Sequence, residues 1–496
     1  MRNFKLFLSI TFLSVVVVST ASATTYYSQG SVAPNLTSSW NTLQGGGGSA
    51  PLVFTGADAF IVQFGHTMTT TALWTVAGTG SQIIINGGAL NLAHNTSVKY
   101  LTLTDGSLTV NAGVTLTVDN GNVISTGEDL YVGTSSGTCT LTNYGIITLI
   151  NSATGKVSNV GTYVHAQNGG TIPTFAWTSF SMCKITGVTT TLPAGLGQSF
   201  GNIIYDCPSQ TASVTLTTAP STISNFTINS TGTGSLVLGS NIAPSTSMKI
   251  NNGIFDLSTF TANGLSLADS IVIGAGVKLR IAGTNSFPVN YNSTKLDGSS
   301  TVEYYGTAAQ SIASKKYGNL LISGTRIGNI TFAASDTIHI AGTFTSTVTF
   351  AGGGFITTGS TVDYNGTGLQ TVTRGKYWNL YISGVRTNDV IFDATDTIHV
   401  AGIFSAKATF SAGGYITDGS TLDFNGTAAQ TIPAFLYYNL SLSGTNRTGN
   451  ISFSNSGTIG IAGSFKPAAS FSSGVYTTTG STVDFNGFSS QIVPPF

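Results

Sequence analysis

The chain holds one dense group of side chains that could carry out chemistry: Asp389, Asp393, Asp396 and His399. Two carboxylates on either side of a sugar linkage can cleave a glycosidic bond, and Asp and His can also bind metal ions. However, Asp396 and His399 have counterparts 60 residues earlier, in Asp336 and His339. We therefore interpret them as features of a repeat that lie on a solvated face, and we predict no catalytic residue.

No other motif adds a metal, cofactor or nucleotide site. His66 follows a glycine at the end of an expected strand, which suits a turn. The glycine runs at 45–48 and 352–354 lack a following Lys-Ser/Thr and a helix, so they do not predict a phosphate site. The three cysteines have no Cys-x-x-Cys spacing; a disulfide between Cys183 and Cys207 and buried free thiols, Cys139 included, both stay open.

The composition favours strands and excludes a nucleic-acid binder. The 496 residues include 61 glycines, only 7% are charged, and the formal net charge is zero. Thr, Val, Ile, Tyr and Phe suit strands, while Gly and Asn suit the corners between them. A sparse, balanced charge offers neither a basic surface for nucleic acid nor one for anionic lipid.

A block of about sixty residues recurs through the last two hundred positions. Each copy contains a Gly-Ser-Thr-Val-Asp-Tyr-Asn-Gly-like run followed by a glutamine, and these glutamines are Gln310, Gln370, Gln430 and Gln491. The steps between them are 60, 60 and 61 residues. Such fixed spacing predicts stacked units that bury their apolar faces on one another.

The alternation inside each copy predicts which side chains face the core. Val362 and Tyr364 lie on one side of an expected strand, and Asp363 lies on the other. The matching acids of the other copies are Glu303, Asp423 and Asp484. We expect these four acids to face solvent, and we expect His339 and His399 to point outward as well.

Three strand landmarks per copy, 18 to 23 residues apart, predict an all-β fold: a parallel β-helix (β-solenoid) with about 20 residues per coil and three coils per repeat. Sixty residues are too few for a β-sandwich module, and four copies after a long irregular lead-in do not close a propeller. Equivalent side chains three coils apart would lie about 14 Å from each other, too far to act on one glycosidic bond.

The predicted organisation has four parts. Residues 1–23 look like an export signal, with Arg2 and Lys5 before an apolar run and a cleavage site after Ala23; no later stretch reaches membrane-spanning length. Residues 24–90 form an N-terminal cap and first strands, 91–297 a degenerate solenoid, and 298–496 the repeats (298–358, 359–418, 419–479 and a partial copy 480–496). Because the last copy stops inside a coil, we expect the chain to be a fragment of a longer protein.

Aromatic residues that differ between copies are candidates for surface contacts. Trp378 and Tyr381 flank the core positions of their strand, where the preceding copy has Gly318 and Leu321. Aromatic platforms suit sugar rings or protein contacts. We predict that Trp378 and Tyr381 mark a contact patch.

The mature chain resembles the large, repetitive, adhesin-like exported β-solenoid proteins of Bacteroidota-type bacteria. The resemblance rests on the opening Thr25-Tyr-Tyr-Ser with Trp40, on Asp58 with Phe64-Gly-His-Thr67, and on the repeated blocks ending in Gln and followed by Tyr-x-Asn-Leu. The opening is also distantly similar to the G8-type segment that precedes β-helical regions. The dispersed, repeated acids, together with this resemblance to adhesin-like proteins, favour a non-enzymatic protein, secreted or at the outer cell surface, that binds glycans or other cell-surface molecules without a cofactor. Self-association is a further option. The alternative is a β-helical polysaccharide lyase or glycoside hydrolase.

Overall fold

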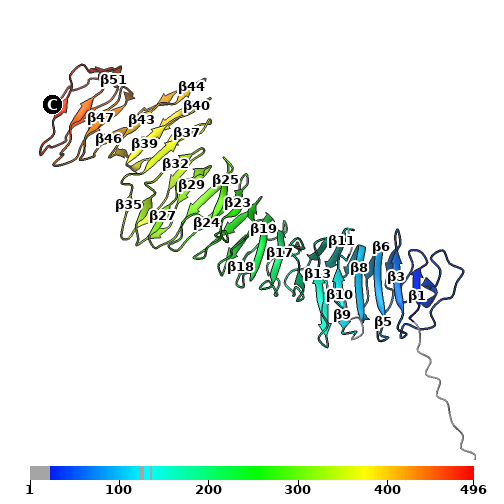
Figure 1. The fold of residues 1–496 in the computed structure, drawn as a ribbon. Coiled ribbons are helices and arrows are strands. Elements are labelled where there is room, and N and C mark those ends of the chain that lie inside the picture. The colour runs from blue at the N-terminus through cyan, green and yellow to red at the C-terminus, as the bar shows by residue number, and fades with distance from the viewer. Residues whose placement is uncertain (1–22, 122–127, 135–136, 496) are drawn as a thin grey trace, which may run out of the picture. The chain divides into compact units, whose positions relative to one another are not determined.

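A computed structural model describes residues 23–121, 128–134 and 137–495 of the chain. These residues form a β-solenoid of about 18 turns built from stacked parallel strands (Figure 1). The single helical element among them is a 3-10 turn of three residues, Thr37–Ser39. The predicted parallel β-helix is therefore confirmed. The proposed export signal lies, apart from Ala23, outside the described residues.

The chain divides into two compact units, Met1–Lys156 and Val157–Phe496. In the first unit, parallel ladders join β1 (Thr25–Ser28), β3 (Ala59–Gln63), β6 (Gln82–Leu92), β8 (Tyr100–Val110) and β11 (Cys139–Asn143). Its first strand also pairs antiparallel with β2 (Trp40–Asn41). Trp40 is buried there against Phe60, with ring centroids 5.2 Å apart, so an atypical segment covers the start of the stack. The predicted part boundaries at 90 and 297 stay predictions.

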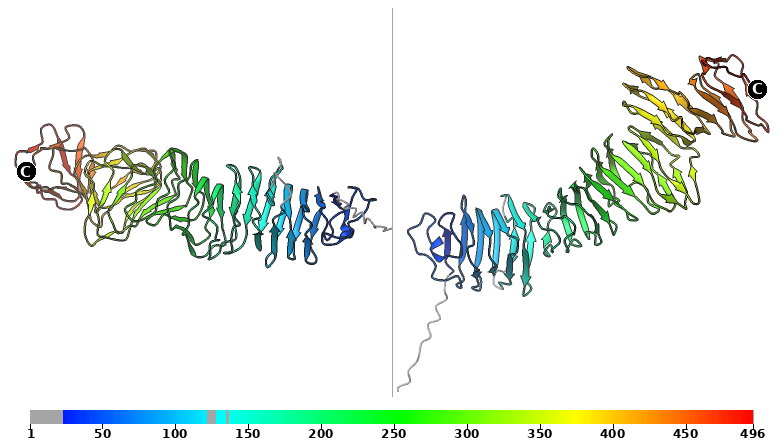
Figure 2. Two further views of the ribbon diagram at one scale, coloured as in Figure 1. Left: turned by 60° about the horizontal axis from the view of Figure 1, so that its bottom comes forward. Right: turned by 180° about the vertical axis from the view of Figure 1, so that it is seen from behind.

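The second unit begins with a regular stack of parallel strands on two faces (Figure 2). One ladder joins β17 (Ser199–Asp206), β19 (Thr222–Ser230), β21 (Ser247–Ile250) and β23 (Ala268–Ile273). Another joins β20 (Ser235–Leu238), β22 (Ile254–Asp256), β24 (Lys278–Ile281), β26 (Thr301–Tyr304), β29 (Asn319–Ile322) and β33 (Phe344–Ser346). Apolar side chains alternate inward along each strand, as the sequence predicts.

The sixty-residue repeats form sheets that are staggered along the chain. One five-stranded sheet joins β28 (Lys316–Tyr317), β32 (Thr337–Ile340), β36 (Thr361–Tyr364), β39 (Asn379–Ile382) and β43 (Phe404–Ala406). The next repeat makes an equivalent sheet from β38 (Gly375–Tyr377), β42 (Thr397–Val400), β46 (Thr421–Phe424), β49 (Asn439–Leu442) and β52 (Phe465–Pro467). Within the first of these sheets, Thr337 pairs with Thr361 and Thr361 pairs with Asn379, so one step of 24 residues and one of 18 lie on either side of the predicted 20 residues per coil.

A second, three-stranded sheet in each repeat does not pair with its counterpart in the next repeat. The first such sheet joins β27 (Gln310–Ile312), β31 (Ile330–Phe332) and β35 (Phe355–Ile356). The following one joins β37 (Gln370–Val372), β41 (Val390–Phe392) and β45 (Tyr415–Ile416). The ladder of backbone hydrogen bonds is therefore interrupted between β35 and β37, and a cleft described below lies at this interruption.

A buried arginine donates a hydrogen bond to three of the four repeated glutamines, Gln310, Gln370 and Gln430. Arg386 is fully buried, and its Nη1 donates to Gln370 Oε1 at 2.7 Å. Gln370 in turn accepts a hydrogen bond from Gly366 N and donates to the backbone oxygens of Ile340 and Gly342, which belong to the previous coil. Arg326 and Arg447 stand at the equivalent positions. Burial lowers the pKa of Arg326 to about 10, so the group stays charged at neutral pH.

Cys139, Cys183 and Cys207 are free and buried, which decides between the two alternatives left open by their spacing. Burial raises the pKa of the Cys139 and Cys207 thiols to about 11. Within the described ranges, no helix has the length and apolar character needed to cross a membrane.

Candidate functional site

A cleft in the second unit has a volume of about 850 Å³ and lies where two consecutive repeats meet. One side comes from the 332–355 segment of the first repeat. The other side comes from the corner before β38 and from the strand region 393–399. The cleft lies at the interruption of the ladder between β35 and β37.

Aromatic rings form the inner wall of the cleft. Phe332 lies against Phe344 and Phe355 with ring centroids 6.1 and 6.0 Å apart, both pairs edge to face. Phe350 contacts Phe355 at 5.1 Å in the same manner. Tyr377 completes the wall, and burial raises its pKa well above its ordinary value. The wall is thus apolar, with the Tyr377 hydroxyl donating to Thr373 O at 2.6 Å.

Charged residues form the rim. Arg374 and Lys376 are exposed and stand on either side of Gly375. Arg374 Nη1 donates to Thr395 Oγ1, and Thr395 Oγ1 donates to Asp393 Oδ1 at 2.6 Å. Burial opposes the ionisation of Asp393, but the hydrogen bonds from Thr395 and from Arg374 N outweigh it and lower the pKa of Asp393. Asp393 is therefore held as a carboxylate at neutral pH.

The structure brings together three of the four residues that the sequence analysis singled out for chemistry. Asp393, Asp396 and His399 all line the cleft. Asp389 lies elsewhere, where its Oδ1 accepts a hydrogen bond from Gly414 N at 2.9 Å. His399 Nδ1 lies 2.9 Å from Asp423 Oδ2 in the next coil, so this histidine is already paired within the ladder.

The prediction that the repeated acids face solvent is wrong for three of them. Glu303, Asp363 and Asp423 are only 6%, 6% and 3% exposed, whereas Asp484 is exposed. Their side chains do lie on the outer face of the strands, as the alternation predicts. They are buried because long side chains from the neighbouring coils cover them, an effect that alternation along one strand cannot reveal.

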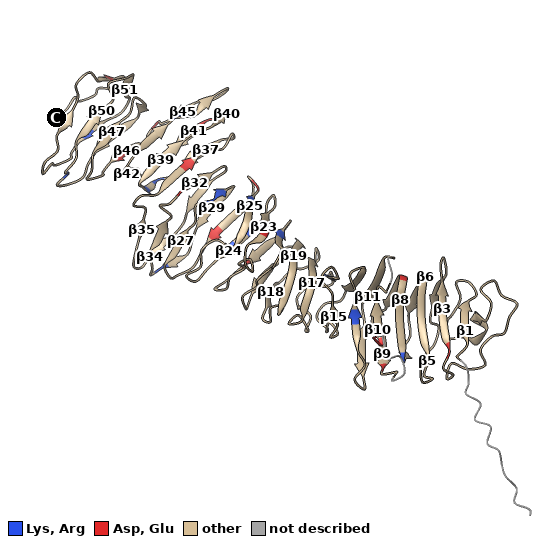
Figure 3. Ribbon diagram, in the orientation of Figure 1, with Lys and Arg blue, Asp and Glu red and all other residues tan. Residues whose placement is uncertain are grey.

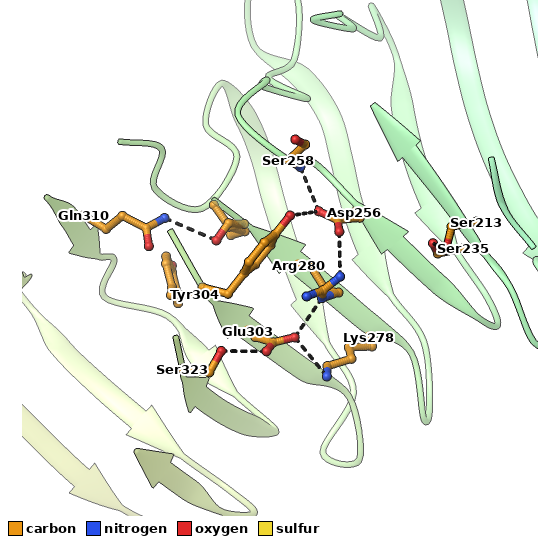
Figure 4. A network of polar contacts seen from close by, with 12 residues as sticks. Ser213, Ser235, Asp256, Ser258, Lys278, Arg280, Glu303, Tyr304, Gln310 and Ser323 are labelled. Atoms are coloured by element: carbon orange, nitrogen blue, oxygen red, sulfur yellow. Dashed lines mark hydrogen bonds and ion pairs between the residues drawn. The ribbon is translucent and has the colours of Figure 1, made fainter. Parts of the chain in front are cut away.

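Glu303 has the most extensive set of covering side chains (Figure 4). Arg280 Nε donates to Glu303 Oε2 at 2.8 Å, and its Nη1 donates to Asp256 Oδ2 at 2.8 Å. Lys278 Nζ and Ser323 Oγ contact Glu303 at 2.9 and 2.7 Å. Burial opposes the ionisation of Glu303, but these partners together lower its pKa. The network therefore joins four consecutive coils and leaves no carboxylate free for acid–base chemistry.

The later repeats use a histidine in place of the arginine. His339 Nδ1 lies 3.1 Å from Asp363 Oδ2, and Ser383 Oγ donates to the same oxygen at 2.8 Å. His339 and His399 point outward as predicted, and each is about one-third exposed. Charged residues are few and scattered over the ribbon, as Figure 3 shows.

The other predicted site residues stay apart from the cleft wall. Trp378 and Tyr381 are both half-buried, at the bend after β38 and on the outer face of β39, and their role as a contact patch stays a prediction. His66 Nδ1 accepts from Gly30 N at 3.2 Å and lies 2.7 Å from Ser28 Oγ, which agrees with a turn. Among the residues that the structure describes, no three His, Cys, Asp or Glu side chains gather as a metal site.

No protein family, curated protein or solved structure matches this chain. The site therefore has to be interpreted from its own geometry. The sequence analysis missed two features of it. The buried arginines follow their glutamines by 16, 16 and 17 residues, a spacing visible in the repeats. The cleft could also be suspected from position 375, which is Gly here and Phe435 in the next copy.

Proposed function

We propose that this chain is a non-enzymatic, exported surface or matrix protein of the adhesin-like type, in which the solenoid presents a binding cleft. The observation that carries this proposal is the contrast between the carboxylates and the cleft. Three of the four repeated acids are covered by partners from adjacent coils, as Glu303 is by Lys278 and Arg280. The cleft, in contrast, has an aromatic wall and exposed cations, which suit binding.

The expected ligands are glycans or other cell-surface molecules, and the proposed location is the exterior of the cell. The export signal at residues 1–23 and the similarity to adhesin-like solenoid proteins of Bacteroidota-type bacteria support this location. The repeats support a structural role as well, because each repeat packs on the preceding one through the same kind of ladder contacts.

A carbohydrate-active enzyme is the second candidate, because Asp393 and Asp396 share the cleft with Arg374 and Lys376. A lyase or hydrolase needs a group that can exchange a proton near neutral pH. The lowered pKa of Asp393 makes that residue a poor general acid. Asp396 is exposed, and its Oδ1 accepts from Thr397 N at 2.7 Å.

A glycan array probed with the mature chain, followed by a depolymerisation assay on every hit, separates the two candidates. Binding without release of shorter products supports the adhesin-like protein. Release of products that is abolished in Asp396→Asn, with Asp484→Asn as the matched control on the exposed acid of the last copy, would establish the enzyme instead.

A further inference from the structure

The cleft has a filled counterpart one repeat further along the chain. There, Phe435 stands inside a frame of four aromatic rings, with centroid distances of 5.5, 5.2, 5.1 and 5.1 Å to Phe392, Phe404, Tyr415 and Tyr437. The last three contacts are edge to face, the arrangement that aromatic pairs favour. The frame therefore surrounds one phenyl ring closely.

The same frame surrounds the open cleft. The ladder register places Val372 opposite Phe392 and Ile312 opposite Phe332, so Phe332 is the counterpart of Phe392. By the 60-residue step, the other counterparts are Phe344, Phe355 and Tyr377, and all four rings line the cleft. Its ring separations of 6.1 and 6.0 Å match the 6.2 and 6.4 Å of the filled frame.

The inserted ring is what differs. Gly375 stands where the next copy has Phe435, and no atom lies within 4 Å of the place that a Cβ would take. The preceding copy has Lys315, whose Nζ lies 5.5 Å from the centre of the Phe287 ring. Because the open frame keeps its shape without an inserted ring, it is pre-formed for one, and a pre-formed site loses little free energy to reorganisation on binding.

The residues at the rim of the cleft indicate which chemical group should stand next to the aromatic ring of a ligand. In the filled copy, Ala434 and Leu436 flank the phenylalanine, whereas Arg374 and Lys376 flank Gly375. Both cations are exposed, while Asp393 is engaged by Thr395 and by Arg374 N. Asp396 also lines the cleft, from the following coil, and is exposed, so the cleft as a whole carries both signs of charge. The two cations directly flank the position of the missing ring, and there they favour a ligand with an anionic group next to its ring.

We propose that the cleft binds an aromatic side chain of an extended polypeptide segment from a partner molecule, with acidic residues beside that side chain. A polypeptide is favoured because the ring of the filled frame is carried by a chain segment that continues into β48 (Leu436–Tyr437). In addition, β35 is the edge strand of its sheet and offers backbone groups to an added strand. This proposal rests on the binding function proposed above, because it takes the cleft as a site for a ligand and not as a catalytic site.

Titration calorimetry with the full chain and the peptide acetyl-Asp-Ala-Phe-Asp-amide tests the proposal. We expect binding at one site per chain, with affinity reduced at least about tenfold when the peptide phenylalanine is replaced by alanine. Replacing the aspartates by asparagine should weaken binding and remove most of its salt dependence. Equal affinity of the alanine peptide would overturn the proposal, as would absence of binding.

Variants of the protein locate the site. The double variant Arg374→Ala, Lys376→Ala should lower the affinity for the acidic peptide and leave the affinity for the asparagine peptide unchanged. A graft of the filled corner, Thr373→Pro, Arg374→Ala, Gly375→Phe and Lys376→Leu, should abolish binding, and Asp484→Asn should not alter it. Retained binding in the graft would place the peptide elsewhere and overturn the proposal, and so would N-acetylphenylalanine binding as tightly as the peptide. A glycan-array failure with intact peptide binding would refute the glycan-directed function alone.

Discussion

The corners at 373–376 and 433–436 occupy the same place in two consecutive repeats and use it in opposite ways. The second corner, Pro433-Ala-Phe-Leu436, fills the aromatic frame with its own ring. The first, Thr373-Arg-Gly-Lys376, leaves the frame open and places two cations at its rim. The frame itself is the same in both, because its rings belong to the strands that hold the coils together. In this solenoid, the strands set the architecture, and the residue at the corner determines whether the aromatic frame is filled or open.

Phe435→Ala would empty the filled frame, and we expect it to have the largest effect on stability. Removing a fully buried phenylalanine from a close-packed site costs about 3–5 kcal/mol. Phe435 is only half-buried, so we expect its loss to lie at the lower end, at about 3 kcal/mol. Urea denaturation should show this loss in the free energy of unfolding. Leu436→Ala is the matched control, since Leu436 is 50% exposed and should change stability by less than about 0.5 kcal/mol. Similar effects for the two variants would mean that the frame collapses around the vacancy.

The buried arginines offer a test of what the two repeats share. Arg386 and Arg447 both bond the repeated glutamine, and methionine at either position would leave that Oε1 and nearby backbone oxygens with fewer donors. We expect a loss of about 2–3 kcal/mol for each, with Arg447→Met the larger, because Arg447 also donates to Ser443 O and Ala428 O. Arg374→Met, on the exposed rim, is the control. No loss at either buried site would show that the desolvation cost of the cation cancels its hydrogen bonds.

The His–Asp pairs predict a difference in acid stability between the third and fourth copies. Burial opposes the ionisation of Asp423, but hydrogen bonds from His399 and Ser443 outweigh it, so its folded pKa lies below the ordinary 3.8. The stability from this group is fully present above about pH 4 and is lost as the pH falls through the folded pKa. Asp423→Asn should therefore cost about 1–2 kcal/mol at pH 7 and flatten the loss of stability between pH 4 and 2.

Asp484→Asn is the control for that comparison. Asp484 pairs across the ladder with Gly460 instead of a histidine, and it is exposed. The asparagine there should alter neither the stability at pH 7 nor its dependence on acid. Thermal unfolding of both variants from pH 2 to 7 measures the difference, and parallel curves for the two would contradict the assigned pairing of Asp423.

The sequence predicts the fold well because the fold depends on periodic, inward side chains. Val362, Tyr364 and their counterparts are read directly from the alternation, and the coil length follows from the distance between them. Burial of Glu303 could not be read in this way, since it depends on Arg280 and Lys278 from the preceding coil. The cleft was missed for a similar reason: its opening results from one absent ring, whose place is defined by Tyr377 of the same strand together with Phe332, Phe344 and Phe355 from preceding segments.

Gly375→Ala gives the smallest expected effect and separates backbone strain from occupancy of the cleft. Gly375 has φ +143°, a conformation that a residue with a Cβ rarely adopts, although open space surrounds the position. We expect a loss of about 1 kcal/mol in the free energy of unfolding from strain alone. Gly354→Ala, in the same cleft with open space and no positive φ, should be nearly neutral. Equal stability of the two variants would mean that the corner can relax to the backbone of the Phe435 corner, which contains no such φ among residues 433–436. The open and filled corners would then differ by their side chains only.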